Sequence, residues 1–362
     1  MSAASSASPV RVAGAGSDGV VQWAIMGAGR IAHRFARSLA HEPHSRLVAI
    51  SCRSGQKADA FAAEFDVPAG HAYADDRLGD EGRAHEALLA DAEVDAVYIA
   101  LPHSMHFEWV LAALRAGKAV LCEKPAMLSA AQMNVVADVA WDRKVLFMEA
   151  MKCRFVPMYA KVKNLLAKGA VGTVASVEAT LCNDMGDRVA TGGDYLSSSV
   201  GGGVLLDTGI YCASWLEELL VAPPVVKHTT VEFEHGVDVY VDSEMRFGSA
   251  FAWLECATNR RKPRRLIVAG NAGRLVVEEL HRSERAVVWD DGDAPFAVTA
   301  PLEVDDFYGE IEHFTQLVRD GMCESPIMPV SASLRCAQIL DVVRASFPQP
   351  PEWSSHARSG GA

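Results

Sequence analysis

Short apolar segments alternate with amphipathic segments from residue 20 to residue 148. In the amphipathic segments, apolar residues recur three or four positions apart, as Ile31, Phe35 and Leu39 do, which is the spacing of one helix face. The apolar segments between them predict strands at residues 21–26, 47–51, 96–100, 119–122 and 145–148. This alternation favours a doubly wound parallel sheet with helices on both faces.

After residue 149 the pattern changes to strands in which apolar and polar residues partly alternate. A helix predicted at 157–168 precedes strands predicted at 174–181, 229–233, 244–256, 266–269, 274–277 and 286–289. Partial alternation is typical of an antiparallel sheet with one solvated face. We therefore predict an α/β protein with an N-terminal Rossmann doubly wound parallel sheet and a C-terminal α+β domain, whose large, mostly antiparallel sheet is open.

Two further helices are predicted near the end of the chain, each with an apolar stripe: Phe307, Ile311, Phe314 and Val318 in one, and Cys336, Leu340, Val343 and Phe347 in the other. We expect a flexible tail (1–19), a dinucleotide-binding domain (20–149), a substrate and oligomerisation domain (150–330), a helix that packs back on the first domain (331–348) and a second tail (349–362). Because no predicted helix remains to cover the outer face of the second sheet, we expect a homo-oligomer that buries this face.

Composition narrows the function classes. The 362 residues include 34 Lys and Arg against 46 Asp and Glu, a formal net charge of −12, which disfavours binding to nucleic acid or to an anionic membrane. No apolar run approaches the ~20 residues of a membrane span. The eight cysteines form no C-x-x-C pair and no zinc-like cluster, and several lie in apolar runs. We expect a soluble, cytoplasmic protein without a metal site.

Two glycine motifs compete for the role of dinucleotide-binding turn. The motif at residues 14–19 fits G-x-G-x-x-G by its letters, but no strand precedes it and no helix pattern follows. The second, Gly27-Ala28-Gly29-Arg30-Ile31-Ala32, follows a predicted strand and opens an amphipathic helix. Its glycines allow a tight turn and the close approach of the backbone to a pyrophosphate, which the helix N-terminus then faces. We expect Gly27, Gly29, Arg30 and Ile31 to bind the cofactor.

The end of the second predicted strand bears on the choice between NAD and NADP. The chain there runs Ser51-Cys52-Arg53-Ser54, with no neighbouring carboxylate in the sequence. NAD sites usually place an acidic residue here, whereas NADP sites tend to offer arginine to the 2′-phosphate. Arg53, with Ser54 and Arg30, therefore favours NADP(H), and NAD(H) remains possible. A solvated loop arginine is the other interpretation of Arg53.

Motifs further along the chain carry a resemblance to a known family. Cys122-Glu123-Lys124-Pro125 follows a buried strand, Met148-Glu149-Ala150 and Arg154-Phe155 come next, and a run of three glycines (201–203) leads to Asp207-Thr208-Gly209-Ile210-Tyr211. In this order they resemble the glucose–fructose oxidoreductase/inositol dehydrogenase (Gfo/Idh/MocA) family over residues 21–347. Within the family, the segments around Glu149 and Tyr211 are most similar to dimeric dihydrodiol dehydrogenases and NADP-dependent xylose dehydrogenases.

The resemblance implies a role for each matching residue. Lys124 would reach the nicotinamide and the reacting oxygen, Tyr211 would be the general acid/base, and Asp207 would hydrogen-bond within the site. Many relatives have histidine where this chain has Tyr211. The matching residues on the cofactor side of the cleft are Pro102, His103, His106, Glu123, Lys124 and Pro125.

Elementary chemistry favours the same residues. Oxidising an alcohol needs hydride loss to the cofactor and a base for the hydroxyl proton. A free tyrosine has a pKa of ~10, which a nearby lysine cation is expected to lower. If the chain from Leu205 onward is helical, Asp207 and Tyr211 are four positions apart and share a face. The alternative is an ordinary half-buried tyrosine with Asp207 as a helix cap.

Residues 183–200 are polar and glycine-bearing, and they depart from the pattern of the most similar relatives. Asp184, Asp187 and Tyr195 are candidates to contact substrate hydroxyls, and a solvated loop is the equal alternative.

We predict an NADP-dependent oxidoreductase acting on a sugar, cyclic polyol or trans-diol. The alternatives are a keto-sugar or carbonyl reductase with the same residues and a catalytically silent dinucleotide sensor. His103 and His106 have ligand-like spacing, but no evident carboxylate or cysteine partner for a metal.

Overall fold

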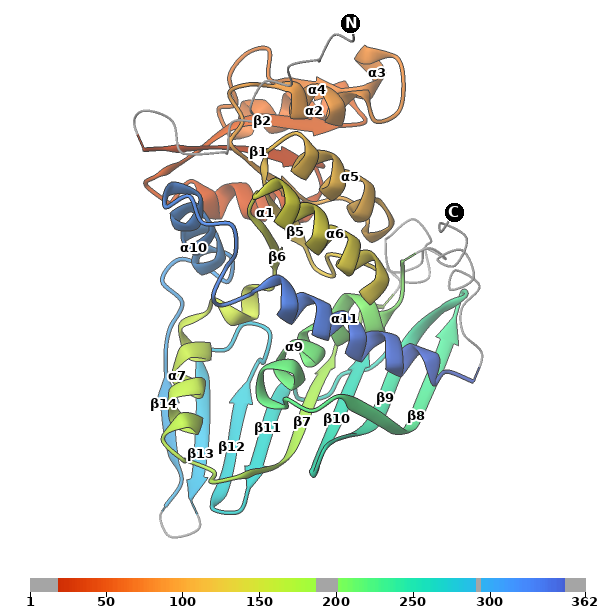
Figure 1. Ribbon diagram of the computed structural model, residues 1–362, viewed down its shortest axis with the longest axis vertical. Coiled ribbons are helices and arrows are strands. Elements are labelled where there is room, and N and C mark those ends of the chain that lie inside the picture. The colour runs from red at the N-terminus through yellow and green to blue at the C-terminus, as the bar shows by residue number, and fades with distance from the viewer. Residues whose placement is uncertain (1–18, 187–200, 291–293, 349–362) are drawn as a thin grey trace, which may run out of the picture.

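The first sheet is parallel and lies in the N-terminal half of the chain (Figure 1). The computed structural model describes residues 19–186, 201–290 and 294–348. The order of the six strands is β3-β2-β1-β4-β5-β6, which reverses direction beside β1 and confirms the doubly wound prediction. The strands are β1 (Val21–Met26), β2 (Ser45–Cys52), β3 (Ala72–Ala74), β4 (Ala96–Ile99), β5 (Ala119–Glu123) and β6 (Phe147–Ala150).

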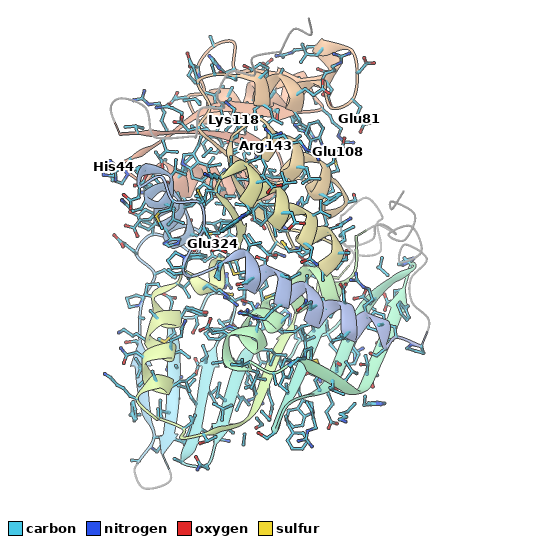
Figure 2. The ribbon with its side chains drawn as sticks, in the orientation of Figure 1. His44, Glu81, Glu108, Lys118, Arg143 and Glu324 are labelled. Carbon is cyan, nitrogen blue, oxygen red and sulfur yellow. The ribbon has the colours of Figure 1, made fainter. Side chains whose placement is uncertain are left out.

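Helices cover both faces of this sheet, because its strands are apolar on both sides. Phe35 of α1 and Phe61 of α2 belong to one apolar core, while Leu88 of α4, Val110 of α5 and Val136 of α6 belong to the other. The outward faces of α5 and α6 carry charged side chains, as Figure 2 shows. The helices are α1 (Arg30–Leu39), α2 (Gly55–Glu64), α3 (Asp75–Leu78), α4 (Arg83–Ala90), α5 (His103–Arg115) and α6 (Ala130–Arg143).

The second sheet has eight strands in the order β14-β13-β12-β11-β7-β10-β9-β8. Only the central pair β7 and β10 is parallel within this sheet as described, so the mostly antiparallel prediction is confirmed. The strands are β7 (Val174–Cys182), β8 (Pro224–Glu234), β9 (Val237–Phe247), β10 (Ala250–Ala257), β11 (Arg265–Gly270), β12 (Gly273–Glu278), β13 (Arg285–Asp290) and β14 (Phe296–Thr299).

One strand prediction is wrong. The segment 244–256 is not a single strand but parts of β9 and β10, which form a hairpin in which Phe247 pairs with Ala250. Gly248 makes the turn with φ of +62°, in the left-handed region that favours glycine. The apolar alternation continues through both arms of this hairpin, so the pattern alone did not reveal the turn. The short strands β3 and β14 were also missed.

The remaining helices join the two sheets (Figure 1). A π-helical turn (Leu205–Gly209) runs directly into α9 (Ile210–Leu219), which packs on the second sheet. Helix α11 (Val330–Ala345) lies along both α9 and α6, and α10 (Tyr308–Arg319) packs against α1 and β1. A short 3-10 turn (Lys152–Arg154) and α7 (Pro157–Ala167) follow β6. None of the described helices is long and apolar enough to cross a membrane.

Candidate active site

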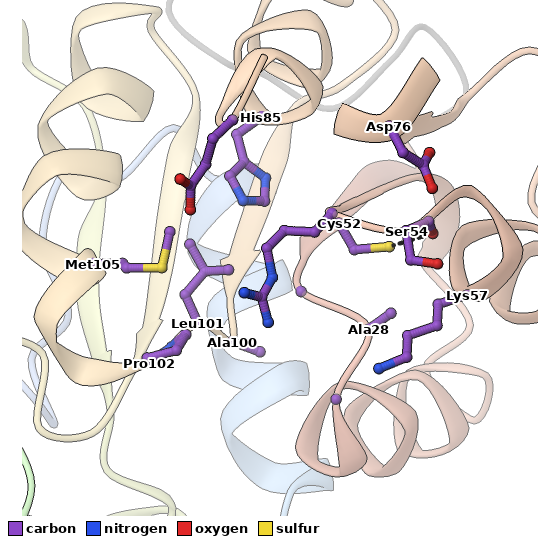
Figure 3. A pocket seen from close by; sticks show the side chains of 14 residues that line it. Ala28, Cys52, Ser54, Lys57, Asp76, His85, Ala100, Leu101, Pro102 and Met105 are labelled. Carbon is purple, nitrogen blue, oxygen red and sulfur yellow. Dashed lines mark hydrogen bonds between the residues drawn. The ribbon is translucent and has the colours of Figure 1, made fainter. Parts of the chain in front are cut away.

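The glycine motif at 27–29 borders a cavity of about 570 Å³ at the carboxyl ends of β1, β2 and β4 (Figure 3). Gly27 has φ of +97°, and a Cβ there would lie 2.5 Å from the carbonyl oxygen of Ala100, so only glycine fits. A Cβ at Gly29 would meet nothing within 4 Å and would project into open space. A side chain at position 27 would block the turn, and one at position 29 would fill the space through which a ligand reaches the backbone. This turn therefore fits the pyrophosphate of a dinucleotide.

Helix α1 begins at this turn. Gly29 is extended at its N-terminus, and among the described side chains none caps the helix there. Uncapped N-terminal amides with the positive end of a helix dipole bind anions such as phosphate. Of the competing motif at 14–19, all but Gly19 lies outside the described residues.

Besides the glycine turn, this cavity is lined by both cations and carboxylates. Arg53 and Ser54 line it as the sequence indicated, and Lys57 of α2 joins them (Figure 3). Asp76, which accepts the backbone N–H of Gly55 at 2.9 Å, and Glu81 also line it. These two carboxylates correct the expectation that no acidic residue is near Arg53, since they come from the segment after β3.

A second cavity, of about 550 Å³, continues from the first. Gly29, Ala100, Leu101 and Pro102 line both, so the two form one trough along the carboxyl edge of the parallel sheet. Ligands of doubly wound sheets bind at this edge, beside the point where the strand order reverses. The second cavity is further lined by Arg30, Ile31, His103, Glu123, Lys124, Lys152, Asp207, Tyr211 and Phe307.

Lys124 and Tyr211 meet in the second cavity. The ammonium of Lys124 donates to the backbone oxygen of Asp207 at 2.6 Å and to its carboxylate at 2.7 Å. It lies 5.1 Å from the centre of the Tyr211 ring. The side chains of Lys124 and Asp207 are 12% and 10% exposed, so this ion pair is largely shielded from water. A cation is thus fixed beside the phenol ring.

Burial sets the protonation of Tyr211. Loss of solvation, followed by the negative charge of Glu123, raises the pKa of the Tyr211 hydroxyl well above its usual 10. The expectation that this pKa is lowered is therefore wrong, because burial and the nearby carboxylates, Asp207 among them, raise it. Tyr211 is therefore a protonated phenol at neutral pH and carries the proton that a reduction would need.

The three glycines before this helix allow a capping contact. Asp238 of β9 accepts the backbone N–H of Leu205 at 2.7 Å, which holds the first turn of the helix that carries Asp207 and Tyr211. Gly203 has φ of +98°, and a Cβ on it would lie 2.1 Å from a carboxylate oxygen of Asp238. The π-helical turn that follows still directs both Asp207 and Tyr211 into the cavity, as their predicted spacing required.

Gly203→Ala is expected to lower the free energy of unfolding by at least about 2 kcal/mol, because backbone strain and the clash with Asp238 add. Gly79→Ala is the matched control, since Gly79 has φ of +100° and nothing within 4 Å of its Cβ position. Urea unfolding of both variants measures the difference. Equal losses in the two variants would show that the clash of the added Cβ with Asp238 contributes nothing beyond the backbone strain.

The two histidines after Pro102 have different places. His103 lines the cavity, its Nδ1 lies 2.8 Å from the carbonyl oxygen of Gly201, and burial lowers its pKa to about 3. His106 is fully buried and does not line the cleft, contrary to expectation. Its ring nitrogens lie 2.8 and 3.0 Å from the carbonyl oxygens of Leu101 and Pro125. Burial lowers the pKa of His106, and a neutral imidazole has one N–H, so His106 donates to one of these two carbonyl groups and lies against the other.

Arg154 positions α9, the helix that carries Tyr211. It donates to the side-chain and backbone oxygens of Ser214 at 2.8 and 3.0 Å and pairs with Glu217, all on α9. The side chains of Arg154 and Glu217 are 1% and 2% exposed. The Arg154-Phe155 part of the family motif thus links β6 to α9.

One cation of the second cavity, Lys152, was not predicted from the sequence. Lys152 lies 9% exposed, pairs with Asp306 and stands 4.8 Å from the centre of the Phe307 ring. A lysine two positions beyond a buried strand, in an apolar segment, was the available signal. Arg34 binds the other oxygen of Asp306 at 2.5 Å.

Of the loop candidates for substrate contact, Asp184 does not join this arrangement. Asp184 is exposed, accepts the N–H of Gly186 at 3.0 Å and lines neither cavity. Asp187 and Tyr195 lie outside the described residues. Within the described ranges, no group of three histidine, cysteine or acidic residues is arranged to hold a metal ion.

Comparisons with known proteins agree with this geometry. A family model described as "Oxidoreductase family, NAD-binding Rossmann fold" matches residues 21–151, and one described as "GFO/IDH/MocA C-terminal domain" matches residues 159–276. The chain is 31% identical over 345 residues to trans-1,2-dihydrobenzene-1,2-diol dehydrogenase of Mus musculus, covering 91% of this chain and 98% of that one. The Xenopus laevis enzyme of the same name is 29% identical over 331 residues, 88% of this chain and 96% of its own.

Solved structures show the same fold. KijD10, a 3-ketoreductase from Actinomadura kijaniata in complex with NADP and TDP-benzene, superposes with a TM-score of 0.79 at 27% identity, over 91% of this chain and all of that one. An aldose-aldose oxidoreductase from Caulobacter crescentus, complexed with glycerol, has a TM-score of 0.79 at 22% identity, over 90% of this chain and 97% of that one. The second likeness concerns the fold alone.

Proposed function

Because the chain belongs to the GFO/IDH/MocA family of oxidoreductases, which it was predicted to resemble, we propose that it transfers a hydride between NADP(H) and a CH–OH group of a sugar, cyclic polyol or trans-diol. Its family makes it an NAD(P)-dependent oxidoreductase. The finer assignment gives Tyr211 the role of acid/base and Lys124 that of its assisting cation.

One observation carries the proposal. Lys124, anchored to Asp207, stands 5.1 Å from the centre of the Tyr211 ring in the same cavity as the N-terminus of α1. Lys124 follows β5, whereas Tyr211 begins α9 against the second sheet, so the folding of both parts is needed to bring them together. A sensor that only binds a dinucleotide has no need of an acid/base pair.

The residues divide the chemistry in a simple way. When bound, the nicotinamide supplies or accepts the hydride. Gly27, Gly29 and the N-terminus of α1 would hold the pyrophosphate, as the open space there allows. In reduction Tyr211 gives its proton to the carbonyl oxygen, and in oxidation it takes the hydroxyl proton. Lys124 would stabilise the negative charge that develops on the substrate oxygen.

A second candidate is reduction of a keto-sugar or related carbonyl as the main direction. The protonated state of Tyr211 is compatible with it, since the proton for the carbonyl oxygen is present at neutral pH, whereas a phenolate base is scarce. The similar 3-ketoreductase supports it as well. The test is to follow the absorbance of reduced nicotinamide with aldoses, inositols and trans-diols plus NADP⁺, and with keto-sugars plus NADPH. Turnover of no member of either panel would contradict both candidates.

We propose NADP(H) as the preferred cofactor, because Arg53, Ser54 and Lys57 meet at one end of the trough and the similar 3-ketoreductase was solved with NADP. Arg53→Ala is expected to weaken NADPH binding about 10- to 100-fold, the range for a hydrogen bond to a charged group, and to change NADH binding much less. Titration by fluorescence measures both. Arg46→Ala, on the exposed start of β2, is the control. Equal losses for the two cofactors would place the 2′-phosphate elsewhere.

We propose that the chain forms a homo-oligomer through the outer face of the second sheet. Along β10, Ala252 and Leu254 are buried, whereas Phe251 is 40% exposed and Trp253 is half-buried. Trp253→Glu is expected to shift the protein to monomers in sedimentation velocity, because it buries a charge in the contact. Trp141→Glu, on the outer face of α6, should leave the oligomer intact. A monomeric wild type at working concentration would contradict this assignment.

A further inference from the structure

The second cavity holds a lysine that the proposed acid/base pair does not use. Lys152 follows β6, and Lys124 follows the neighbouring strand β5, in which Glu123 pairs with Ala150. The two segments leave the parallel sheet at the same edge, so both lysines line one cavity. Lys152 does not line the first cavity, where the glycine turn meets Arg53 and Ser54, so we assign it to the substrate.

Lys152 shares its carboxylate partner with a second cation. Asp306 carries one negative charge and lies between two cations, Lys152 and Arg34. Glu310 is fully buried nearby, and neither of its oxygens has a hydrogen-bond partner among the described residues. Burial and the charge of Glu123 raise the pKa of Glu310 well above its usual 4.5, so it is neutral and does not compensate Lys152.

The other charged groups are already engaged. Asp305 accepts the backbone N–H groups of Phe307 and Tyr308 at 2.8 and 3.1 Å, at the start of α10. On the opposite wall, Asp207 is paired with Lys124, and Glu123 accepts from the hydroxyl of Tyr98 and the backbone N–H of Lys124. Of the lining residues, three are cations (Arg30, Lys124, Lys152) and two are carboxylates (Glu123, Asp207).

Cations and an imidazole also lie beside the aromatic rings of the cavity. Arg34 and Lys152 lie 4.6 and 4.8 Å from the centre of the Phe307 ring. Tyr211 has Lys124 at 5.1 Å from its ring centre and the ring of His281 at 6.0 Å. Little ring surface is left on which an aromatic diol could stack, whereas acceptor-rich ligands find cations on both walls.

We propose that the substrate is a polyhydroxylated compound with an anionic group, a carboxylate or a phosphate, which binds Lys152 while Tyr211 acts on the carbon that carries the hydroxyl or carbonyl. This inference rests on the proposed function. Lys152 has three N–H donors and Asp306 takes one, which leaves donors for the anion. Lys152 is therefore a specificity residue, which selects the substrate without taking part in the proton or hydride transfer.

The test compares sugars that share their stereochemistry and differ in charge. D-Glucose, D-glucuronate and D-glucose 6-phosphate form one set, and D-galactose with D-galacturonate forms another. With NADP⁺, the anionic members are expected to have kcat/KM at least about tenfold above the neutral one, from one charge-assisted contact. Comparing kcat/KM of the uronates with that of the phosphate identifies whether a carboxylate or a phosphate fits the site. Equal or better turnover of the neutral sugars would overturn the inference and leave the proposed function standing.

Lys152→Met separates binding of the anion from a structural role of the lysine. It is expected to raise KM for the anionic substrate about 10- to 100-fold, with kcat and the KM of neutral sugars little changed. Lys152→Arg should restore much of the loss, and Lys168→Met, at the exposed end of α7, should change nothing. Equal losses for charged and neutral substrates would contradict the assignment.

A binding measurement covers the case in which no member of the sets turns over. D-Glucuronate is then expected to bind the NADP⁺-loaded wild type more tightly than D-glucose in calorimetry, and to lose this preference in Lys152→Met. That result would retain the anion site and reject the proposed hydride transfer to these sugars. Equal binding of both sugars would reject the anion site itself.

Discussion

Tyr211→Phe is expected to lower kcat at least about 100-fold while leaving NADPH binding unchanged, because it removes the acid/base group and keeps the ring. The ring packs in the cavity, where it is 6% exposed, and the hydroxyl is the part that moves a proton. Steady-state kinetics with cofactor titration measures both quantities. Lys124→Ala should give a loss of similar size through the missing cation.

The pH profile distinguishes a proton-transfer role for Tyr211 from a structural one. Since burial and Glu123 raise the pKa of Tyr211 well above 10, the group stays protonated across the neutral range. The reductive kcat should then be independent of this group at neutral pH, and the oxidative kcat should rise with pH. Tyr240→Phe, which removes a hydroxyl bound to Glu255 at 3.0 Å on the second sheet, is the control. Near-normal kcat in Tyr211→Phe would refute the acid/base assignment.

Arg154→Met is expected to lower the free energy of unfolding by about 3–5 kcal/mol, because it removes the buried cation of Glu217 and leaves this carboxylate with the half-exposed Arg335 alone. The guanidinium also holds both oxygens of Ser214, so the position of α9 and of Tyr211 should suffer with stability. Urea unfolding measures the loss, and kcat at a permissive temperature reports the displaced helix.

Arg335→Met provides a matched control for this prediction. Arg335, on α11, pairs with the other oxygen of the same Glu217, but its side chain is 51% exposed. Loss of an exposed pair costs about 0–1 kcal/mol. Comparable losses in the two variants would mean that burial does not determine the strength of this network.

The parts of the fold that sequence predicted are those that local pattern determines. The five strands of the parallel sheet that the sequence predicted begin or end within a few residues of their observed bounds, because buried parallel strands are short apolar runs between amphipathic helices. Gly27 and Gly29 could be identified because a turn between strand and helix has few solutions. The hairpin at Gly248 was missed because its two arms continue one alternation.

Contacts between distant segments account for what the sequence did not reveal. Lys57 and Asp76 join Arg53 only through the packing of α2 and the segment after β3, and Lys152 enters the cavity only because β5 and β6 are neighbours. The pKa of Tyr211 was expected to fall because Lys124 was near. Its burial and the nearby carboxylates are tertiary facts, and they reverse the sign.

The most direct test of the central claim is to follow a deuterium from C4 of labelled NADPH into the product of a keto-sugar reduction. The deuterium is expected on the carbon of the new alcohol, and Tyr211→Phe is expected to abolish this transfer while still binding NADPH. Tight binding of NADPH by the wild type, with no deuterium transferred to any carbonyl substrate and no NADP⁺ reduced by any alcohol of the panel, would contradict it and indicate a protein that only senses the dinucleotide.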